Sequence, residues 1–290
     1  MSYVHVPVMV NEVLEALNLK ADSIVADATA GTGGHLGEIA KLIGISGKIF
    51  AFDRDPTSIE FCQTRFTELE FPQIKFVCTN FTNIPESIPE NMLLDGLIAD
   101  LGISSFQLEN KERGFSFKYN TPLDMRMNQK GDTTAYELIN KSTELELANI
   151  IYKYGEEHLS RRIARSIKGN KYIINSGLEL AKIIASAYRG KNFKINPATR
   201  TFQALRIAVN DELGELEKLL NRLDSIIKPG GRVAIITFHS LEDRIVKHFF
   251  KNNHETWRFI SKKPIIPKKD EIFKNPRSRS AKLRSVEKIM

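Results

Sequence analysis

Residues 25–37 read Val25-Ala-Asp-Ala-Thr-Ala-Gly-Thr-Gly-Gly-His-Leu-Gly37, and a second apolar run further along the chain ends at Asp53. The apolar start of this stretch is typical of a short buried strand. The glycines permit the positive φ angles of a tight turn, and residues 35–43 have the apolar spacing of a helix. An acid about 20 residues past such a turn, at the end of a second strand, can hydrogen-bond a ribose diol. The stretch therefore predicts the first β–α–β unit of a nucleotide-binding sheet.

The glycine pattern favours a cationic ligand over a dinucleotide. Counting G-x-G-x-x-G from Gly31, the third glycine position holds Leu36, and that glycine normally lies beside a pyrophosphate. Asp27 also places a carboxylate just before the loop. S-adenosylmethionine has a ribose diol, an ammonium and a sulfonium, and it has no phosphate. A glycine turn without a ligand is the alternative for this loop taken alone.

The remaining apolar patterns predict an α/β protein with a parallel, doubly wound sheet and a helical insertion. Buried-strand patterns occur at 23–28, 48–53, 74–78, 94–100, 233–238, 257–261 and 281–288. Helical patterns occur at 35–43, 56–67, 134–140, 143–152, 156–168, 178–188, 201–227 and 241–251, and Lys228–Gly231 is expected to end the long one. The sheet domain is assigned to 1–107 and 197–290, and the all-helical insertion to 108–196.

The composition is that of an ordinary globular protein, with 42% apolar and 27% charged residues in a chain of 290. No apolar run approaches the ~18 residues of a membrane span, and the N-terminus lacks the basic region of a signal peptide. We therefore expect a cytoplasmic protein without membrane contact. Cys62 and Cys78 are expected to be reduced core thiols, because no CxxC motif is present.

The net charge of +7 is concentrated near the C-terminus. Residues 247–290 hold thirteen Lys and Arg against four Asp and Glu, a balance of +9, and the rest of the chain carries −2. A basic segment on a near-neutral body suggests a polyanionic partner such as nucleic acid. Arg277, Arg279 and Arg284 are its candidate phosphate contacts. A solvated tail that only aids solubility is the alternative.

Polar residues at two strand ends are candidates for the reacting centre. Asp100 closes the fourth strand pattern, Gly102 allows close approach of a ligand, and Gln107 offers both a donor and an acceptor. Phe81, after the third strand, supplies an apolar wall for an adenine ring. The alternatives are a turn-capping role for Asp100 and a core position for Phe81.

Two further polar clusters are candidates for substrate contacts. Arg126 closes the run Leu123-Asp-Met-Arg126, and the run Arg161-Arg162-Ile-Ala-Arg165 follows it in the insertion. His239 follows the fifth strand. A solvated helix face and a structural histidine are the respective alternatives. No metal site is expected, because the histidines and acids lack ligand spacing. P-loop and nucleophile-elbow motifs are absent from the sequence.

These stretches together resemble the ribosomal RNA small subunit methyltransferase H family, also called MraW. The resemblance runs through nearly the whole chain. It is carried by residues 5–8, 27–36, 52–55, 100–107, 114–126, 154–157, 197–206, 228–231, 238–244 and 275–284. It implies a seven-stranded, mostly parallel class I (Rossmann-like) methyltransferase domain with a helical insertion that recognises the substrate.

The resemblance also implies an activity and a set of ligands. The activity is methyl transfer from S-adenosyl-L-methionine to the N4 amine of a cytidine in the decoding region of 16S ribosomal RNA, which we expect to be presented in the 30S particle. By matching positions, the cofactor-binding residues are Gly33, Gly34, His35, Asp53, Phe81, Asp100 and Gln107, and Asp100 is also the catalytic residue.

Three positions depart from the family pattern: Thr32 and Asn196 replace a glycine and a histidine, and Asp100-Leu-Gly-Ile replaces the N/D-P-P-F/Y tetrapeptide of amino-methyltransferases. Two other functions use the same features. A nicotinamide dehydrogenase has a similar sheet, although Leu36 disfavours it. A non-catalytic RNA-binding assembly factor would carry the same basic segment and transfer no methyl group.

Overall fold

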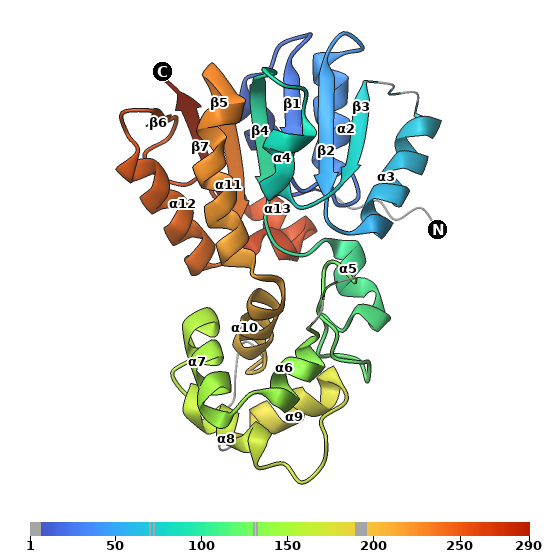
Figure 1. Cartoon of the computed structure of the whole chain (residues 1–290), viewed down its shortest axis with the longest axis vertical. Helices are drawn as coiled ribbons and strands as arrows, with labels where there is room; N and C mark the ends of the chain where they lie inside the picture. Colours follow the sequence, from blue (N-terminus) through green and yellow to red (C-terminus); the bar gives the residue numbers. More distant parts are fainter. Residues whose placement is uncertain (1–6, 70, 72, 130, 132, 189–195) are drawn as a thin grey trace. The chain divides into compact units, whose positions relative to one another are not determined.

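The computed structural model describes residues 7–69, 71, 73–129, 131, 133–188 and 196–290, so His5 and Val6 of the first family-like stretch lie outside the described residues. The chain forms two compact units (Figure 1). The sheet unit comprises Met1–Gly102 and Leu213–Met290, and the helical unit comprises Ile103–Glu212. Both boundaries differ from the predicted ones at 107/108 and 196/197, because α5 (Ser105–Glu109) and α10 (Thr199–Asn210) both group with the helical unit.

The sheet unit is built on seven strands in the order β3-β2-β1-β4-β5-β7-β6. Strands β1 to β5 run parallel to one another, and β7 is antiparallel to both β5 and β6. The predicted seven-stranded, mostly parallel sheet is therefore confirmed. The strands span Ile24–Asp27 (β1), Lys48–Asp53 (β2), Ile74–Cys78 (β3), Leu94–Asp100 (β4), Ile227–Thr237 (β5), Trp257–Phe259 (β6) and Lys282–Lys288 (β7).

Successive side chains of the central strands pack alternately into two separate hydrophobic cores, one on each face of the sheet. On β5, Val233 and Ile235 join one core, whereas Ala234 and Ile236 join the other. This follows from the two-residue period of a strand. Because both faces are covered, the buried parts of the central strands are apolar runs, such as residues 97–99 of β4 and 233–236 of β5, as in other buried parallel sheets.

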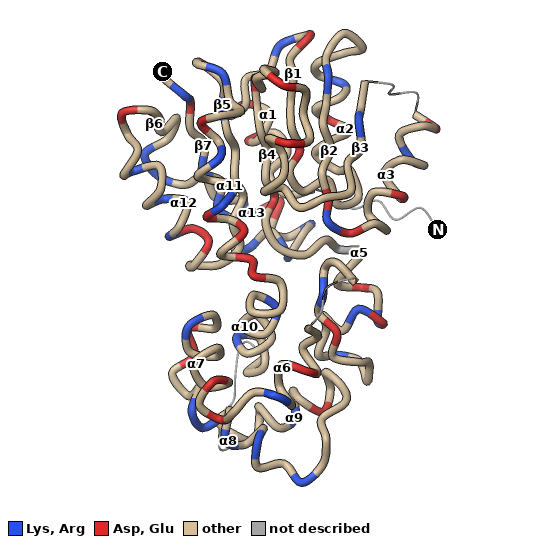
Figure 2. The backbone as a smooth tube through the Cα atoms, in the orientation of Figure 1, with Lys and Arg blue, Asp and Glu red and all other residues tan. Residues whose placement is uncertain are grey.

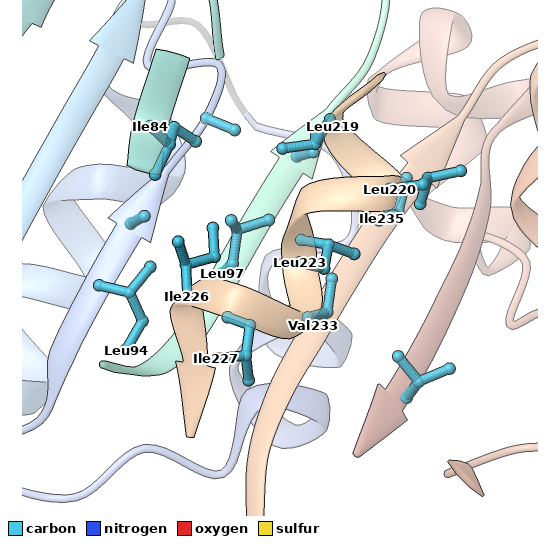
Figure 3. Close-up of a cluster of buried hydrophobic side chains, with 14 of the residues drawn as sticks. Ile84, Leu94, Leu97, Leu219, Leu220, Leu223, Ile226, Ile227, Val233 and Ile235 are labelled. Carbon is cyan, nitrogen blue, oxygen red and sulfur yellow. The ribbon is translucent and has the colours of Figure 1, made fainter. Parts of the chain in front are cut away.

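Helices cover each face of the sheet (Figure 1). One face packs against α1 (Val10–Leu17), α2 (Gly34–Ile43) and α3 (Pro56–Glu68). The other packs against α4 (Ile84–Ser87), α11 (Glu212–Ile226) and α12 (Ser240–Asn252). Figure 3 shows how Leu219, Leu220 and Leu223 of α11 lie over Leu97, Val233 and Ile235 of the sheet.

The predicted single helix over 201–227 is wrong, because the structure breaks it in two. Asp211 adopts a left-handed conformation with φ 47° and caps α10 by donating its N–H to the carbonyl of Ile207. Aspartate tolerates this conformation better than most residues, and it ends the α10 hydrogen-bond ladder before α11 begins. The run Lys228–Gly231, expected to be a helix stop, lies inside β5, where the β4–β5 register shifts between Leu94 and Gly96.

The helical unit has its own apolar core. Its longer elements are α5 (Ser105–Glu109), α6 (Ala135–Lys141), α7 (Glu144–Gly155), α8 (Ser160–Lys168), α9 (Gly177–Ser186) and α10. Threonines set two helix starts: Thr134 and Thr143 each form a capping box with a glutamate three residues later. Among the described residues of this unit only an isolated bridge, Pro122 with Ser176, has β geometry.

The basic C-terminal segment is part of the sheet unit and not a free tail. Strands β6 and β7, helix α13 (Lys269–Lys274) and the 3-10 helix η3 (Pro276–Ser280) account for much of it (Figure 2). Arg284 is 7% exposed and donates from Nε to Asp243 at 2.6 Å. Its prediction as a phosphate contact is therefore wrong, because its charge is already balanced inside the unit. Arg277 and Arg279 are exposed.

Both cysteines are free thiols, but their environments differ. Cys62 is buried on α3, as predicted. Cys78 is exposed, so its prediction as a core residue is wrong. It ends β3, which lies at the edge of the sheet and has a neighbour on one side only. No helix within the described residues is long and apolar enough to cross a membrane.

The α11 face of the sheet gives a direct test of this packing. Leu223 is fully buried among the residues of Figure 3. Leu223→Ala is expected to lower the free energy of unfolding of the sheet unit by about 2–5 kcal/mol, because it leaves a cavity as well as losing buried area. Urea unfolding followed by circular dichroism measures the loss. Leu69→Ala removes a leucine that is 51% exposed and serves as control, with an expected change of about 0.5 kcal/mol or less. Equal losses in both variants would contradict the assignment of this core.

Candidate functional site

Three carboxylates meet at one edge of the sheet because of strand register. Strand β1 lies between β2 and β4, and Asp27, its last residue, is paired with Ala51 and Ile98. Asp53 and Asp100 lie two residues beyond those partners, at the ends of β2 and β4. The chain order reverses at this place in the sheet, which is where open α/β sheets bind their ligands. Asp53 and Asp100, each predicted at a strand end, therefore lie at the same edge of the sheet.

Burial is the main cause that raises the pKa values of all three acids, and neighbouring negative charges add to it. Burial raises the pKa of Asp27 to about 7, and the nearby Asp53 adds to the increase. The pKa of Asp53 is raised to about 6, again chiefly by burial. Burial, with the charges of Asp27 and Glu242, raises the pKa of Asp100 to about 8. A cationic ligand at this edge relieves that repulsion, whereas a phosphate increases it.

Asp53 joins the glycine loop to the end of β2. One carboxylate oxygen accepts the N–H of Gly31 at 2.9 Å, and the other accepts the N–H of Asp55 at 2.8 Å. A carboxylate has about four acceptor positions. Each oxygen therefore retains a lone pair, which is the arrangement that a pair of vicinal hydroxyl groups requires.

Gly33 and Gly34, where the glycine loop enters α2, have no room for a side chain. Gly33 has φ 77°, and a Cβ on it would lie 2.4 Å from the ring of Phe66. A Cβ on Gly34 would lie 2.8 Å from Pro7. The chain thus enters α2 with no side chain at these two positions. The positive φ and the close packing explain why glycine occupies both positions.

Asp100 is held by its backbone while part of its carboxylate stays unpaired. Its N–H donates to Thr29 Oγ1 at 2.7 Å. Its Oδ1 is buried and has no hydrogen-bond partner among the described residues. Its Oδ2 lies 3.7 Å from Nδ1 of His35, whose Nε2 is 2.8 Å from the carbonyl of Val8. Sequence reasoning missed Thr29. Only its place two residues beyond Asp27, on the strand beside β4, could have indicated it.

The other two predicted cofactor residues are placed less directly. Phe81 begins the 3-10 helix η1 (Phe81–Asn83) after β3 and packs, partly buried, against the α11-side core. Gln107 belongs to the helical unit, is 4% exposed and accepts the N–H of Ser104 in a capping box. Their roles toward a cofactor stay predictions.

Two residues singled out in the sequence have structural partners. Arg126 donates from Nε and from one terminal nitrogen to Asp124, at 2.9 and 2.8 Å, and its other terminal nitrogen reaches the carbonyl of Gly131. His239 is the N-cap of α12, where Nδ1 accepts the N–H of Glu242. The structural alternative left open in the sequence fits His239, whereas Arg126 lies in a loop and not on the solvated helix face considered for it. The exposed cations of α8, Arg161 and Arg165, lie on its solvated face.

Comparisons with known proteins agree in fold and family. The model of the MraW methylase family matches residues 2–289. Ribosomal RNA small subunit methyltransferase H of Clostridioides difficile (strain 630) is 44% identical, with 100% of both chains covered. The protein of the same name from Thermosipho africanus (strain TCF52B) is 45% identical, with 98% of each chain covered. A solved chain from Clostridium thermocellum, described as a "putative rRNA-methylase", covers 99% of this chain with a TM-score of 0.52 at 12% identity, and it supports the fold alone.

The three raised pKa values predict an unusual pH dependence of stability. The folded acids, with pKa values of about 6, 7 and 8, hold protons that the unfolded chain has already lost. This contribution is therefore complete at low pH and is lost as pH rises through those values. The unfolding free energy of the ligand-free protein is expected to fall between about pH 5 and about pH 9. Urea titrations across that range measure it.

S-adenosylmethionine should bind more tightly as pH rises, because its positive charges favour the ionised acids. Calorimetry at the same pH values as the urea titrations tests this pH dependence of binding.

Asp100→Asn removes the group with the highest of the three pKa values and should flatten the alkaline part of the profile of unfolding free energy against pH. A variant profile identical to that of the parent would show that Asp100 does not titrate in this range.

Proposed function

Because this chain belongs to the MraW methylase family, we propose that it transfers a methyl group from S-adenosylmethionine to the N4 amine of a cytidine in the decoding region of 16S ribosomal RNA. The chain is an enzyme of the S-adenosylmethionine-dependent methyltransferase class. Its named relatives act on small-subunit ribosomal RNA, which supplies the substrate class. The specific amine and nucleotide come from the resemblance in sequence.

The observation that carries this proposal is the cluster of three carboxylates at the ends of β1, β2 and β4. Raised pKa values of Asp27, Asp53 and Asp100 mark an edge where negative charge lacks compensation. S-adenosylmethionine fits this edge because it brings a sulfonium and an ammonium as well as a ribose diol. The pyrophosphate of a nicotinamide cofactor would add negative charge instead, so the dehydrogenase alternative is disfavoured.

Different residues of the sheet unit are proposed to bind different parts of S-adenosylmethionine. Asp53 accepts the ribose hydroxyls with the lone pairs left by Gly31 and Asp55. Gly33 and Gly34 belong to the proposed set as the turn into α2, and the close packing of Phe66 and Pro7 against them fixes the path of its backbone. Asp27 is 2% exposed and contributes through its negative field. Phe81 and Gln107 complete the proposed set, as the wall for the adenine ring and as a polar contact.

Asp100 is proposed to act on the target amine. The bound cofactor supplies a methyl group already activated by the sulfonium. The acceptor is the harder partner, because the N4 lone pair is delocalised into the cytosine ring. The unpaired Oδ1 of Asp100 accepts a hydrogen bond from N4–H, orients the amine and receives the proton that the nitrogen gives up. His35 positions the other carboxylate oxygen from 3.7 Å.

The helical unit is proposed to recognise the RNA, which is presented in the assembled 30S particle in the cytoplasm. The exposed Arg161 and Arg165 of α8 support phosphate contact there, although Glu144 pairs with Arg165 at 3.4 Å. An ion pair between exposed groups is weak and exchanges readily for another partner. Arg126 is better explained as a support for its own loop, because its donors are engaged.

The decisive experiment is incubation with labelled S-adenosylmethionine and unmethylated small ribosomal subunits, followed by mapping of the modified nucleotide. Label on N4 of one decoding-region cytidine is the expected result. Free 16S RNA serves as a parallel substrate and separates the two forms of presentation. Tight RNA binding without any label would favour the assembly-factor alternative.

Asp53→Ala tests the ribose contact. Loss of charge-assisted hydrogen bonds should weaken S-adenosylmethionine binding by about 1.5–3 kcal/mol, measured by calorimetry. Asp270→Ala, at an exposed position of α13, is the matched control and should leave the affinity unchanged. Unchanged affinity in a folded Asp53 variant would remove this residue from the site.

Asp100→Asn tests the charge at the amine, because it keeps the shape of the side chain. We expect turnover to fall about a hundredfold or more, as is typical when a proton acceptor is lost, with a much smaller change in cofactor affinity. Single-turnover methylation isolates the chemical step. A near-normal single-turnover rate would exclude an essential charge at position 100.

A further inference from the structure

A cavity of about 340 Å³ lies in the sheet unit beside the end of β5, outside the residues assigned above to cofactor or amine. Residues from four places line it: 238–240 at the β5–α12 junction, Ile266 with Pro267, Ile272 of α13, and 279–282 at the η3–β7 junction. We refer to it as the η3 pocket. Its volume lies at the lower end of the range of small-ligand sites.

The η3 pocket adjoins the strand end that carries Asp100. In the sheet, Asp100 is paired with Ile236 of β5, and Phe238 of the pocket lies two residues further along. That offset corresponds to about 7 Å along a strand. Phe238 also faces the loop after Asp100, since a Cβ built on Gly102 would lie 3.8 Å from its ring. The pocket is therefore a neighbour of the reacting centre within the same unit.

The lining combines apolar walls with hydrogen-bond donors. Phe238, Ile266, Pro267 and Ile272 form the apolar part, and Arg279 and Lys282 bring positive charge. No carboxylate side chain lines the pocket. A group that fits has an apolar face and acceptor oxygens with negative charge. A nucleotide of single-stranded RNA has both features, because its base packs on an aromatic or apolar surface and its phosphate takes a cation.

Arg279 is the cation best placed for a phosphate. It is exposed and has no ion pair or hydrogen bond within the part of the chain that the structure describes. Lys282 is partly balanced, since its Nζ lies 3.1 Å from Asp243. The same carboxylate holds Arg284 at 2.6 Å, so one acid faces two cations and the pocket edge keeps a positive balance. A planar guanidinium also matches phosphate geometry.

We propose that the η3 pocket binds a nucleotide of the ribosomal RNA strand next to the target cytidine, with Arg279 on its phosphate and Phe238 against its base. The proposal rests on the proposed function, because it takes the neighbouring strand end as the reacting centre. Binding of this flanking nucleotide anchors the strand while the target base is out of its stack. The pocket thus sets where the target lies and takes no part in the chemical step.

Arg279→Ala tests the phosphate contact with small ribosomal subunits as substrate. We expect KM for the subunits to rise about tenfold with kcat nearly unchanged, because a charge-assisted contact to the substrate is lost. The slope of log(kcat/KM) against log salt should become shallower by about 0.7, the value for one phosphate contact on a single strand. Cofactor affinity, measured by calorimetry, should stay that of the parent.

Two further variants make the test specific to the pocket. Lys274→Ala removes an exposed cation of the neighbouring helix α13 that does not line the pocket, and it should leave KM nearly unchanged. Ile266→Asp keeps every cation and places a carboxylate in the wall, so it should raise KM as Arg279→Ala does. Equal effects of Lys274→Ala and Arg279→Ala, or no effect of Ile266→Asp, would overturn the proposal.

The same variants keep this inference separate from the proposed function. Methyl transfer by the parent with unchanged KM in Arg279→Ala would reject the pocket and leave the function standing. If the parent transfers no methyl group, the function fails. Fluorescence anisotropy with a labelled single-stranded RNA of the decoding-region sequence then tests the pocket, which requires weaker binding by Arg279→Ala than by Lys274→Ala.

Discussion

The burial of three carboxylates at one edge of the sheet is the constraint on which the rest of this site depends. Strand register brings Asp27, Asp53 and Asp100 to one edge, and burial raises their pKa values to between about 6 and about 8. A protein keeps such a cluster at a cost in stability, and strain of this kind is characteristic of functional sites. Backbone N–H groups offset part of it, as Gly31 and Asp55 do for Asp53. The remainder is released by a ligand that brings positive charge.

Most of the sheet unit was predictable from the sequence because its physical signals are local. Uninterrupted apolar runs, each ending in a polar residue, gave the central strands to within a few residues, since strands buried on both faces must be apolar throughout. The long helix was mispredicted because Leu205, Leu216 and their neighbours keep helical spacing across Asp211. The spacing of apolar residues does not reveal the left-handed φ of Asp211, which separates the two helices. Helix α1 was not predicted, because its eight residues directly continue the N-terminal stretch of the chain and no side chain caps the start of the helix.

The acidic residues of the site were predictable from the sequence, but the residues that contact them were not. Asp53 and Asp100 were found because strand ends are recognisable and parallel strands end at a common edge. Thr29 was missed because its hydrogen bond to the Asp100 backbone joins residues 71 positions apart, a relation that depends on strand order. His239 and Arg126 were candidates because they are polar residues next to predicted strands or turns. Their capping and loop-supporting partners are tertiary contacts that no local pattern reveals.

Charge counted along the sequence also overstates what the C-terminal segment can offer to RNA. Arg284 and Lys282 share Asp243, and Lys288 donates to the carbonyls of Asp224 and Ile227. These cations hold β7 against the rest of the sheet unit, where burial makes their partners costly to exchange. The balance of +9 is therefore divided between structural charges and free ones. Arg279, by contrast, is exposed and lies in the η3 pocket beside the strand end that carries Asp100, so the folded structure holds this charge near the reacting edge.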